Sequence, residues 1–363
     1  MNRRIRRITT CRAALRRSLA PAVVLIAAAS APAGAELSQK LAGRIQIGVV
    51  HDSNVLEQLS DPVDDQALQL YGSVEHRLQY GRWSLLSVGR LGLHRYREIH
   101  DDSRVLGEGN WRLSYETASG FAVGGDVLVE GRDYADSAST RGYGQLRAEG
   151  FVQLPLGMTR VQISGGQTVV DYQVTPGHEQ SGQRFDLLIS RRVEFLSVRA
   201  QVGVGAFDSN RRAVRLDGST PVVKPFDQED DFTSVGLSAE YLRRFYLAIE
   251  YTYLDNRSNS YGSAYYYHRV GFSFRRRVLS PKVSAGILLQ LEQRVYRDDL
   301  SRFDVINFDS ERESNNAVIG EVGRDLTPGV SAKLRLGWHR DEAVLRDEYQ
   351  TKVLGEVHLE WRF

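Results

Sequence analysis

The sequence predicts an all-β protein, a transmembrane antiparallel up-and-down β-barrel of about 16 strands. Three observations carry this prediction. Apolar and polar residues alternate at a period of two in many segments. These segments run for about ten to fourteen residues, whereas globular strands have about five or six. Short and long connections interleave between them. Ten residues tilted by about 45° cover roughly 23 Å, close to the apolar band of an outer-membrane barrel.

Residues 1–35 have the composition of a cleaved export signal. They contain seven Arg and no acidic residue, and a run of small apolar residues ends in Ala33-Gly34-Ala35. The apolar run has about fifteen residues, and a membrane-spanning helix needs about 20. We therefore expect cleavage after Ala35, with residues 36–363 forming the barrel. Cys11, the one cysteine of the chain, would leave with the signal.

Removal of the signal changes the net charge. The whole chain has 47 basic and 45 acidic residues, and residues 36–363 keep 47 − 7 = 40 basic against 45 acidic, a net charge of −5. A chain without cysteine has no disulfide and no Cys-based metal site. Its acidic balance also argues against nucleic acid as a partner. We predict no cofactor.

The final segment alternates most clearly. One face carries Thr351, Val353, Gly355, Val357, Leu359, Trp361 and Phe363, and the other carries Lys352, Glu356, His358, Glu360 and Arg362. We count sixteen such segments, and fourteen or eighteen stay open because boundaries read from sequence shift by a few residues. The segments start near Arg44, Leu68, Trp83, Val105, Phe121, Tyr143, Thr159, Arg184, Phe195, Phe232, Phe245, Tyr265, Pro281, Asn316, Val330 and Tyr349.

The connections predict how the sheet closes. Seven are tight and eight are longer and rich in Asp, Ser, Asn and Gly; the longest is expected at 208–231, with Pro221 and Pro225. Because the two kinds interleave, all tight turns fall at one end of the sheet, as the periplasmic turns of an outer-membrane barrel do. Aromatic residues such as Tyr80 and Trp83 flank these turns, as an interfacial girdle requires.

The last strand resembles the carboxy-terminal signal by which barrel-assembly machinery recognises outer-membrane proteins of Gram-negative bacteria. The residues that carry this resemblance are Val357, Leu359, Trp361 and Phe363. It implies a location in the bacterial outer membrane, with lipid and lipopolysaccharide as surroundings and the barrel-assembly machinery as a partner.

Two further segments carry a narrower resemblance. Residues 47–55, Ile-Gly-Val-Val-His-Asp-Ser-Asn-Val, and the tyrosine-rich residues 250–269 are similar to segments of porin-type barrels encoded with exopolysaccharide biosynthesis. They are also similar to the barrel portion of surface lipoprotein assembly modifiers. The first resemblance implies passage of polysaccharide and periplasmic polysaccharide-export components as partners.

The polar face of the strands predicts a wet lumen of mixed charge. The lumen-lining residues would be Glu75, Arg77, Arg90, Glu108, Arg112, Asp126, Arg132, Arg147, Glu149, Arg184, Arg269, Arg275, Lys333, Arg335 and Glu356. Because both signs occur on neighbouring strands, strong anion or cation selection is not expected. Alternatively, these residues form a lattice of Arg–carboxylate pairs that partly fills the lumen and stiffens it.

Neither catalysis nor metal binding is predicted. His51-Asp52-Ser53 and His100-Asp101-Asp102-Ser103 place a base, an acid and a hydroxyl together, but adjacent strand residues point to opposite faces and a catalytic relay must converge. The acidic runs Asp227–Asp231 and Asp298-Asp299 lack the spacing of a calcium loop.

The leading hypothesis is therefore a porin-like outer-membrane channel for hydrophilic solutes or polysaccharide, without enzymatic activity. The alternatives are a structural or anchoring barrel of a surface secretion or assembly complex, and an outer-membrane hydrolase.

Overall fold

The computed structural model describes residues 37–56, 61–135, 142–172, 179–217, 220–278, 280, 282–297, 316–342 and 349–363. The predicted export signal, Cys11 and the acidic pair Asp298-Asp299 lie outside the described residues. Within the described ranges, no helix is both long and apolar enough to cross a membrane.

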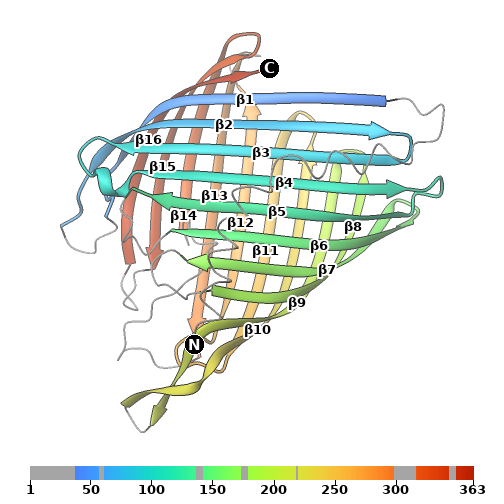
Figure 1. Cartoon of the computed structure of the whole chain (residues 1–363). Helices are drawn as coiled ribbons and strands as arrows, with labels where there is room; N and C mark the ends of the chain where they lie inside the picture. The colour runs from blue at the N-terminus through green and yellow to red at the C-terminus, as the bar shows by residue number, and fades with distance from the viewer. Residues whose placement is uncertain are drawn as a thin grey trace.

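Sixteen antiparallel strands form a closed barrel, in which each strand pairs with its sequence neighbours and β1 pairs with β16 (Figure 1). The strands are β1 (Leu37–Asp52), β2 (Asp65–Tyr80), β3 (Trp83–Tyr96), β4 (Arg104–Glu116), β5 (Ala122–Tyr134), β6 (Tyr143–Leu156), β7 (Thr159–Tyr172), β8 (Glu179–Val193), β9 (Leu196–Asp217), β10 (Thr220–Leu242), β11 (Phe245–Ser258), β12 (Tyr265–Arg277), β13 (Val283–Tyr296), β14 (Asn316–Thr327), β15 (Val330–Glu342) and β16 (Tyr349–Arg362). A short 3₁₀ helix, η1 (His100–Asp102), follows β3. The predicted fold class and strand number are confirmed.

Tight turns connect the strands at one end of the barrel, which we call the turn end; the opposite end is the loop end. Several of these turns need a residue with positive φ, which glycine adopts without steric cost. Gly81, Gly120, Gly157 and Gly329 have φ values of 55°, 83°, 63° and 86°, and Glu194 adopts 48° in the turn between β8 and β9. The turn residues therefore fix the pairing of successive strands.

The prediction of a long loop at 208–231 is wrong, because most of these residues extend β9 and β10 into a paired hairpin. The hairpin projects beyond the neighbouring strands at the loop end (Figure 1). Its register shifts between Val223 and Asp227. Pro225 lies at this shift, and a proline has no N–H to donate to the ladder. Turn-forming residues here interrupt the pairing without ending it.

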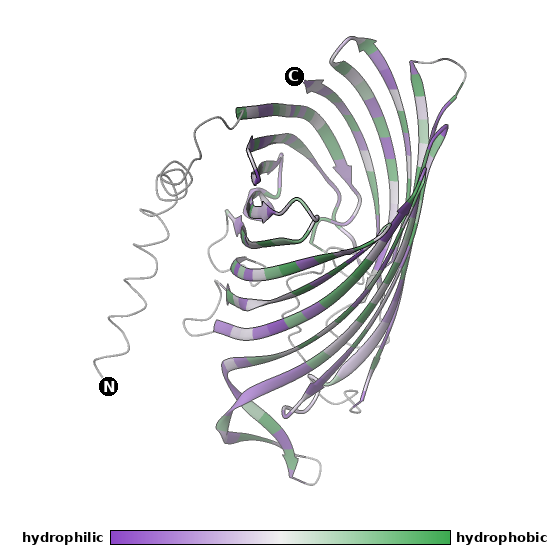
Figure 2. Cartoon of the chain, turned by 90° about the vertical axis from the view of Figure 1, so that its right-hand side faces the viewer, coloured by the Kyte–Doolittle hydropathy of each residue, from purple (hydrophilic) through white to green (hydrophobic). Residues whose placement is uncertain are grey.

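The two faces of the sheet have opposite polarity. Hydrophobic and hydrophilic segments alternate along the strands (Figure 2). Ile47 on one face is 50% exposed, whereas Glu360 on the other is 1% exposed. Large apolar side chains are exposed on nearly every strand of the closed sheet, which suits lipid and not water. The protein is thus a membrane-embedded barrel.

An aromatic girdle marks the turn end on the outer face. The ring centroids of Trp83 and Tyr115 lie 5.1 Å apart, and those of Tyr241 and Phe245 lie 5.0 Å apart. Aromatic side chains of this kind favour the boundary between hydrocarbon and headgroups. The girdle predicted from the residues beside the tight turns is present.

The first and last strands close the barrel. Gly43 and Phe363 exchange two backbone hydrogen bonds, of 2.8 and 3.0 Å. A Cβ at Gly43 would lie 2.3 Å from Cζ of Phe363, so a larger residue there would displace this exposed ring. The four residues of the predicted assembly signal lie on the outer face of β16, and Trp361 and Phe363 are 60% and 61% exposed. Their role in assembly stays a prediction.

Candidate functional site: the polar inner wall

Contacts between strands that are not neighbours identify the inner face. Nη2 of Arg112 on β4 donates to Oε1 of Gln162 on β7 at 3.0 Å, across two intervening strands. The guanidinium of Arg112 also lies 4.0 Å from the ring centroid of Phe151 on β6. Such contacts are possible only on the concave face of a closed sheet. The strand register then places all fifteen predicted lumen-lining residues on this face.

Many of the predicted residues form short ion pairs. Arg90 donates to both carboxylate oxygens of Glu108, at 2.7 and 2.8 Å. Nε of Arg77 lies 2.5 Å from Glu75 on the same strand. Arg77 and Glu75 can form an ion pair because side chains two residues apart on a strand lie on the same face.

The central part of the inner wall, on β4–β9, lines a cavity of about 260 Å³ that is open to the lumen. We call its lining the polar wall. Its residues are Asn110, Arg112, Asp126, Leu128, Arg147, Glu149, Gln162, Ser164, Arg184, Asp186, Leu188 and Gln201. Three are cations and three are carboxylates, so the polar wall has no net charge. Its wide range of donors and acceptors suits contact with water and hydroxylated solutes.

The ion pairs of the polar wall differ in length. Arg184 makes two hydrogen bonds to Asp186, of 2.6 and 2.8 Å, and Gln201 adds a third at 2.8 Å. Arg147 and Glu149 are 3.3 Å apart. Arg112 and Asp126, on neighbouring strands, are 3.6 Å apart, which leaves the guanidinium free to reach Gln162. These cations are held in place but remain partly exposed to the lumen.

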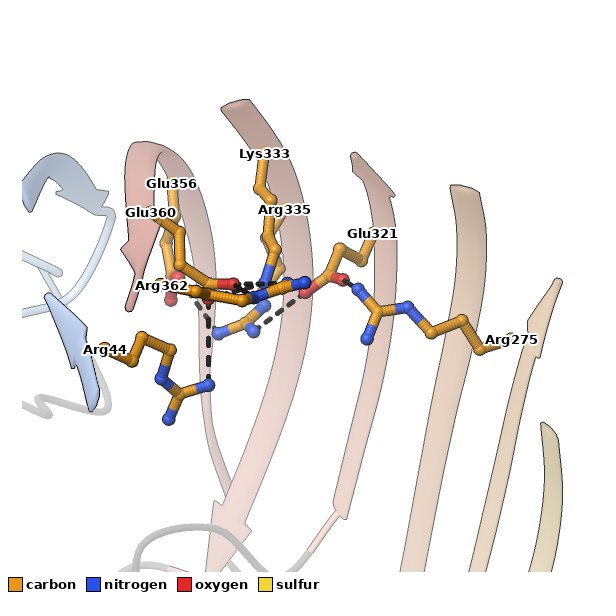
Figure 3. Close-up of polar contacts among 8 residues, drawn as sticks. All are labelled: Arg44, Arg275, Glu321, Lys333, Arg335, Glu356, Glu360 and Arg362. Atoms are coloured by element: carbon orange, nitrogen blue, oxygen red, sulfur yellow. Dashed lines mark hydrogen bonds and ion pairs between the residues drawn. The ribbon is translucent and has the colours of Figure 1, made fainter. Parts of the chain in front are cut away.

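A second group of inner-face charges lies where the barrel closes (Figure 3). We call it the seam network: Arg44, Arg275, Glu321, Lys333, Arg335, Glu356, Glu360 and Arg362. Glu321 accepts hydrogen bonds from Arg275 at 2.6 Å and from Arg335 at 3.0 Å. Arg335 in turn donates to Glu356 at 3.2 Å. The chain of contacts links β12, β14, β15 and β16.

Glu360 is the most enclosed carboxylate of the seam network. Oε2 accepts from Nζ of Lys333 at 2.7 Å and lies 3.7 Å from Nη1 of Arg44. Oε1 accepts from Nε of Arg362 at 2.6 Å. Three cations from β1, β15 and β16 therefore meet on one carboxylate at the closing strand pair.

Two predicted residues, Arg132 and Arg269, contact aromatic rings. The guanidinium of Arg132 lies 5.7 Å from the ring centroid of Tyr143. Arg269 lies 5.1 Å from that of Tyr267 and donates to Glu292 at 2.8 Å. Both stay on the inner face but outside the two groups defined above.

Sequence reasoning missed several members of these groups. Arg44 and Glu321 were not among the expected lumen residues, although alternation with exposed Ile45 and Val322 points both inward. Gln162 and Ser164 were not expected either, because they carry no charge. Alternation alone could have found all four.

The His–Asp–Ser clusters do not assemble a catalytic arrangement. Asp52 points inward and accepts a hydrogen bond from Tyr96 Oη at 3.3 Å, while His51 lies exposed on the opposite face. Ser53 accepts from the backbone N–H of Val353 at 2.8 Å. Nδ1 of His100 lies 3.0 Å from the carbonyl of Tyr96. Each group has a local structural partner.

The acidic run 227–231 lies in β10, so its side chains alternate between the two faces. Asp227 pairs with Arg212 at 3.2 Å, and Asp230 accepts a hydrogen bond from Gln228 at 2.8 Å. Across the described ranges, no three His, Cys, Asp or Glu side chains gather as a metal site would require.

Asp65 anchors the loop end, beyond the apolar band of β2 that begins at Leu68. Oδ2 accepts from the backbone N–H groups of Glu98 and Ile99, each at 2.9 Å, and Oδ1 accepts from that of Gln66 at 2.6 Å. Burial alone would raise the pKa of Asp65, but these three hydrogen bonds, with the charge of Arg97, lower it below the ordinary value. The carboxylate joins β2 to the connection after β3.

No protein-family model matches the chain, and no curated protein matches it either. Among solved structures, the barrel is similar to a mutant of the Rhodobacter blastica porin, with 10% identity and a TM-score of 0.41, covering 90% of this chain and 100% of that one. It is also similar to OccK2 (OpdF) of Pseudomonas aeruginosa, with 10% identity and a TM-score of 0.39, covering 90% of this chain and 98% of that one.

Proposed function

We propose that this protein is an outer-membrane channel through which hydrophilic solutes diffuse. The observation that carries the proposal is the polar wall. It is a charge-balanced, partly exposed set of side chains around a cavity of about 260 Å³ inside a closed sixteen-strand barrel. Barrels with about sixteen strands are wide enough to leave an aqueous path.

The chemistry of the polar wall defines the class of solute. Guanidinium, carboxylate, amide and hydroxyl groups alternate over β4–β9, so hydroxyl-rich solutes would exchange hydrogen bonds with water for hydrogen bonds with the wall. Because the wall carries three cations and three carboxylates, its pairs would cancel any strong preference for anions or cations. Entry of polysaccharide, and partnership with polysaccharide-export components, the barrel-assembly machinery or lipopolysaccharide, stay predictions.

Planar-bilayer recording tests the proposal. The protein, purified from membranes after expression of the full chain, is expected to give stepwise conductance that rises with salt concentration. Absence of conductance at every voltage would contradict an open path and would favour the structural barrel considered from the sequence.

Two adjacent residues of β7 give a matched pair of variants. Ser164 faces the cavity and is 8% exposed, whereas Ile163 faces outward and is 56% exposed. Ser164→Trp places an indole in the path and should lower single-channel conductance. Ile163→Trp places the same group in lipid and should leave conductance unchanged. Equal effects of the two variants would show that current does not pass along the polar wall.

A further inference from the structure

A second cavity, of about 340 Å³, lies at the turn end between the β10–β11 turn and the ends of β12 to β16. We call it the turn-end cavity. Tyr246, Ser284, Asp325 and Ser331 line it, and the register places all four on the inner face. The cavity therefore opens at the turn-end mouth of the barrel, on other strands than the polar wall.

The lining of the turn-end cavity is strongly basic. Half of its cations have acidic partners. These are Arg275 with Glu321, Arg277 with Asp325, and both Lys333 and Arg362 with Glu360. The Arg277–Asp325 distance is 3.7 Å, longer than that of a charge-assisted hydrogen bond.

The other four cations have no acidic partner. Arg243 lies 4.6 Å from the ring centroid of Phe195. The side chains of Arg244 and Lys282 are exposed and make no hydrogen bond or ion pair with any residue that the structure describes. Arg276 pairs in register with Phe245 of the outer aromatic girdle, so its side chain lies on the outer face and adds no charge to the cavity. The seven cations other than Arg276, against Asp325, Glu321 and Glu360, leave an excess of 7 − 3 = 4 positive charges.

This excess separates the turn-end cavity from the polar wall, where three cations meet three carboxylates. Like charges held together repel one another, and a bound anion would relieve that repulsion. Guanidinium groups present fork-like donors that match the oxygens of phosphate and carboxylate groups. A volume of about 340 Å³ is at the lower end for ligand sites, so a compact anion fits best.

We propose that the turn-end cavity binds compact anions that carry two or more phosphate or carboxylate groups. Arg244 and Lys282 supply the uncompensated charge, and Arg277 lies beside them, 3.7 Å from Asp325. The site is independent of conduction, because a closed barrel with the same mouth would bind the same anions.

Inorganic tripolyphosphate is the probe, and isothermal titration calorimetry in zwitterionic detergent measures its binding to the whole protein. The test variant is Arg244→Gln/Lys282→Gln. The control is Arg215→Gln/Lys224→Gln, which removes the same charge at the loop end. Heat-modifiable migration on gels reports folding of both, and Arg244→Gln alone serves if the double variant does not fold.

We expect saturable one-to-one binding, weakened at least about tenfold in the turn-end variant and unchanged in the control, a difference of about 1.4 kcal/mol. Arg244→Gln alone should weaken it by a smaller factor. Equal affinity in all variants, equal weakening by both double variants, or no saturable binding would overturn the proposal.

A second arm identifies the source of the anion. The titration is repeated in phosphatidylcholine nanodiscs with and without phosphatidylglycerol. Competition by phosphatidylglycerol would assign the site to anionic lipid headgroups, and unchanged binding would assign it to free solutes. Neither result depends on channel conductance, so failure of the channel proposal and failure of this one are separable.

Discussion

The seam network and the polar wall use the same residue types on the same face of the barrel, yet their surroundings differ. In the seam network, Glu360 has a fully buried side chain and Lys333 a side chain 8% exposed. In the pairs beside and within the polar wall the cations remain open to the lumen, and the side chain of Arg90 is 47% exposed. Burial makes Glu360 and Lys333 depend on their partners, although the seam cations Arg44 and Arg362 are themselves 41% and 54% exposed. In the exposed pairs, water can replace either partner. The seam thus stabilises closure, and the wall is available to solutes.

The largest expected effect comes from removing the central charge of the seam. Glu360→Gln keeps the shape of the side chain but leaves Lys333, Arg362 and Arg44 without their shared carboxylate. Breaking a buried pair typically costs about 3–5 kcal/mol. Urea unfolding of the barrel in lipid vesicles, followed by tryptophan fluorescence, measures the loss.

Glu75→Gln is the matched control for that substitution. It makes the same chemical change, but Glu75 and its partner Arg77 have side chains 41% and 65% exposed. The cost should be at most about 1 kcal/mol. Similar losses of stability from the two variants would show that burial of Glu360 does not set the cost of breaking its ion pairs.

Alternation in the sequence predicts which residues face inward but not which of them meet. Glu360 and Lys333 are on the polar sides of their segments, so their direction follows from a period of two. Their meeting with Arg44 requires the register of β1 against β16, and that register exists only once the barrel is closed.

The errors of prediction have a similar origin. Pro221, Pro225 and the acidic run after them are typical turn formers, so the β9–β10 hairpin was expected to be a loop. Pairing along 22- and 23-residue strands overrides that local preference. The turn-end cavity was not expected, because its cations come from two turns and from the ends of β12, β15 and β16, which only the closed sheet brings together.

Asp65 is intermediate between the seam network and the exposed pairs. It is a buried carboxylate held more by backbone N–H groups than by the charge of Arg97. Because its pKa is lowered in the folded state, its stabilising contribution is present above the ordinary Asp value of about 3.9 and is lost as pH falls through the folded pKa. Hydrogen bonds to a charged group contribute about 1.5–3 kcal/mol.

The carboxyl carbon of Asp65, followed by NMR in detergent, should therefore titrate with a midpoint below about 3.9. The amide proton shifts of Glu98 and Ile99 should move with the same midpoint. Asp65→Asn should abolish that shared transition. A midpoint above the ordinary value would mean that burial outweighs the backbone hydrogen bonds.

The smallest effect on stability is expected at the partly exposed Arg90–Glu108 pair beside the polar wall, where the ion selectivity of the channel should respond instead. A double-mutant cycle of Arg90→Gln and Glu108→Gln should give a coupling of about 0.2–1 kcal/mol, because both side chains are partly exposed. Arg90→Gln alone leaves Glu108 without its cation and should shift the reversal potential in a salt gradient toward cations, and Glu108→Gln should shift it toward anions. Opposite shifts of the reversal potential with nearly unchanged stability would distinguish this pair from the seam network. A coupling as large as the cost of Glu360→Gln would mean that the two regions play the same structural part.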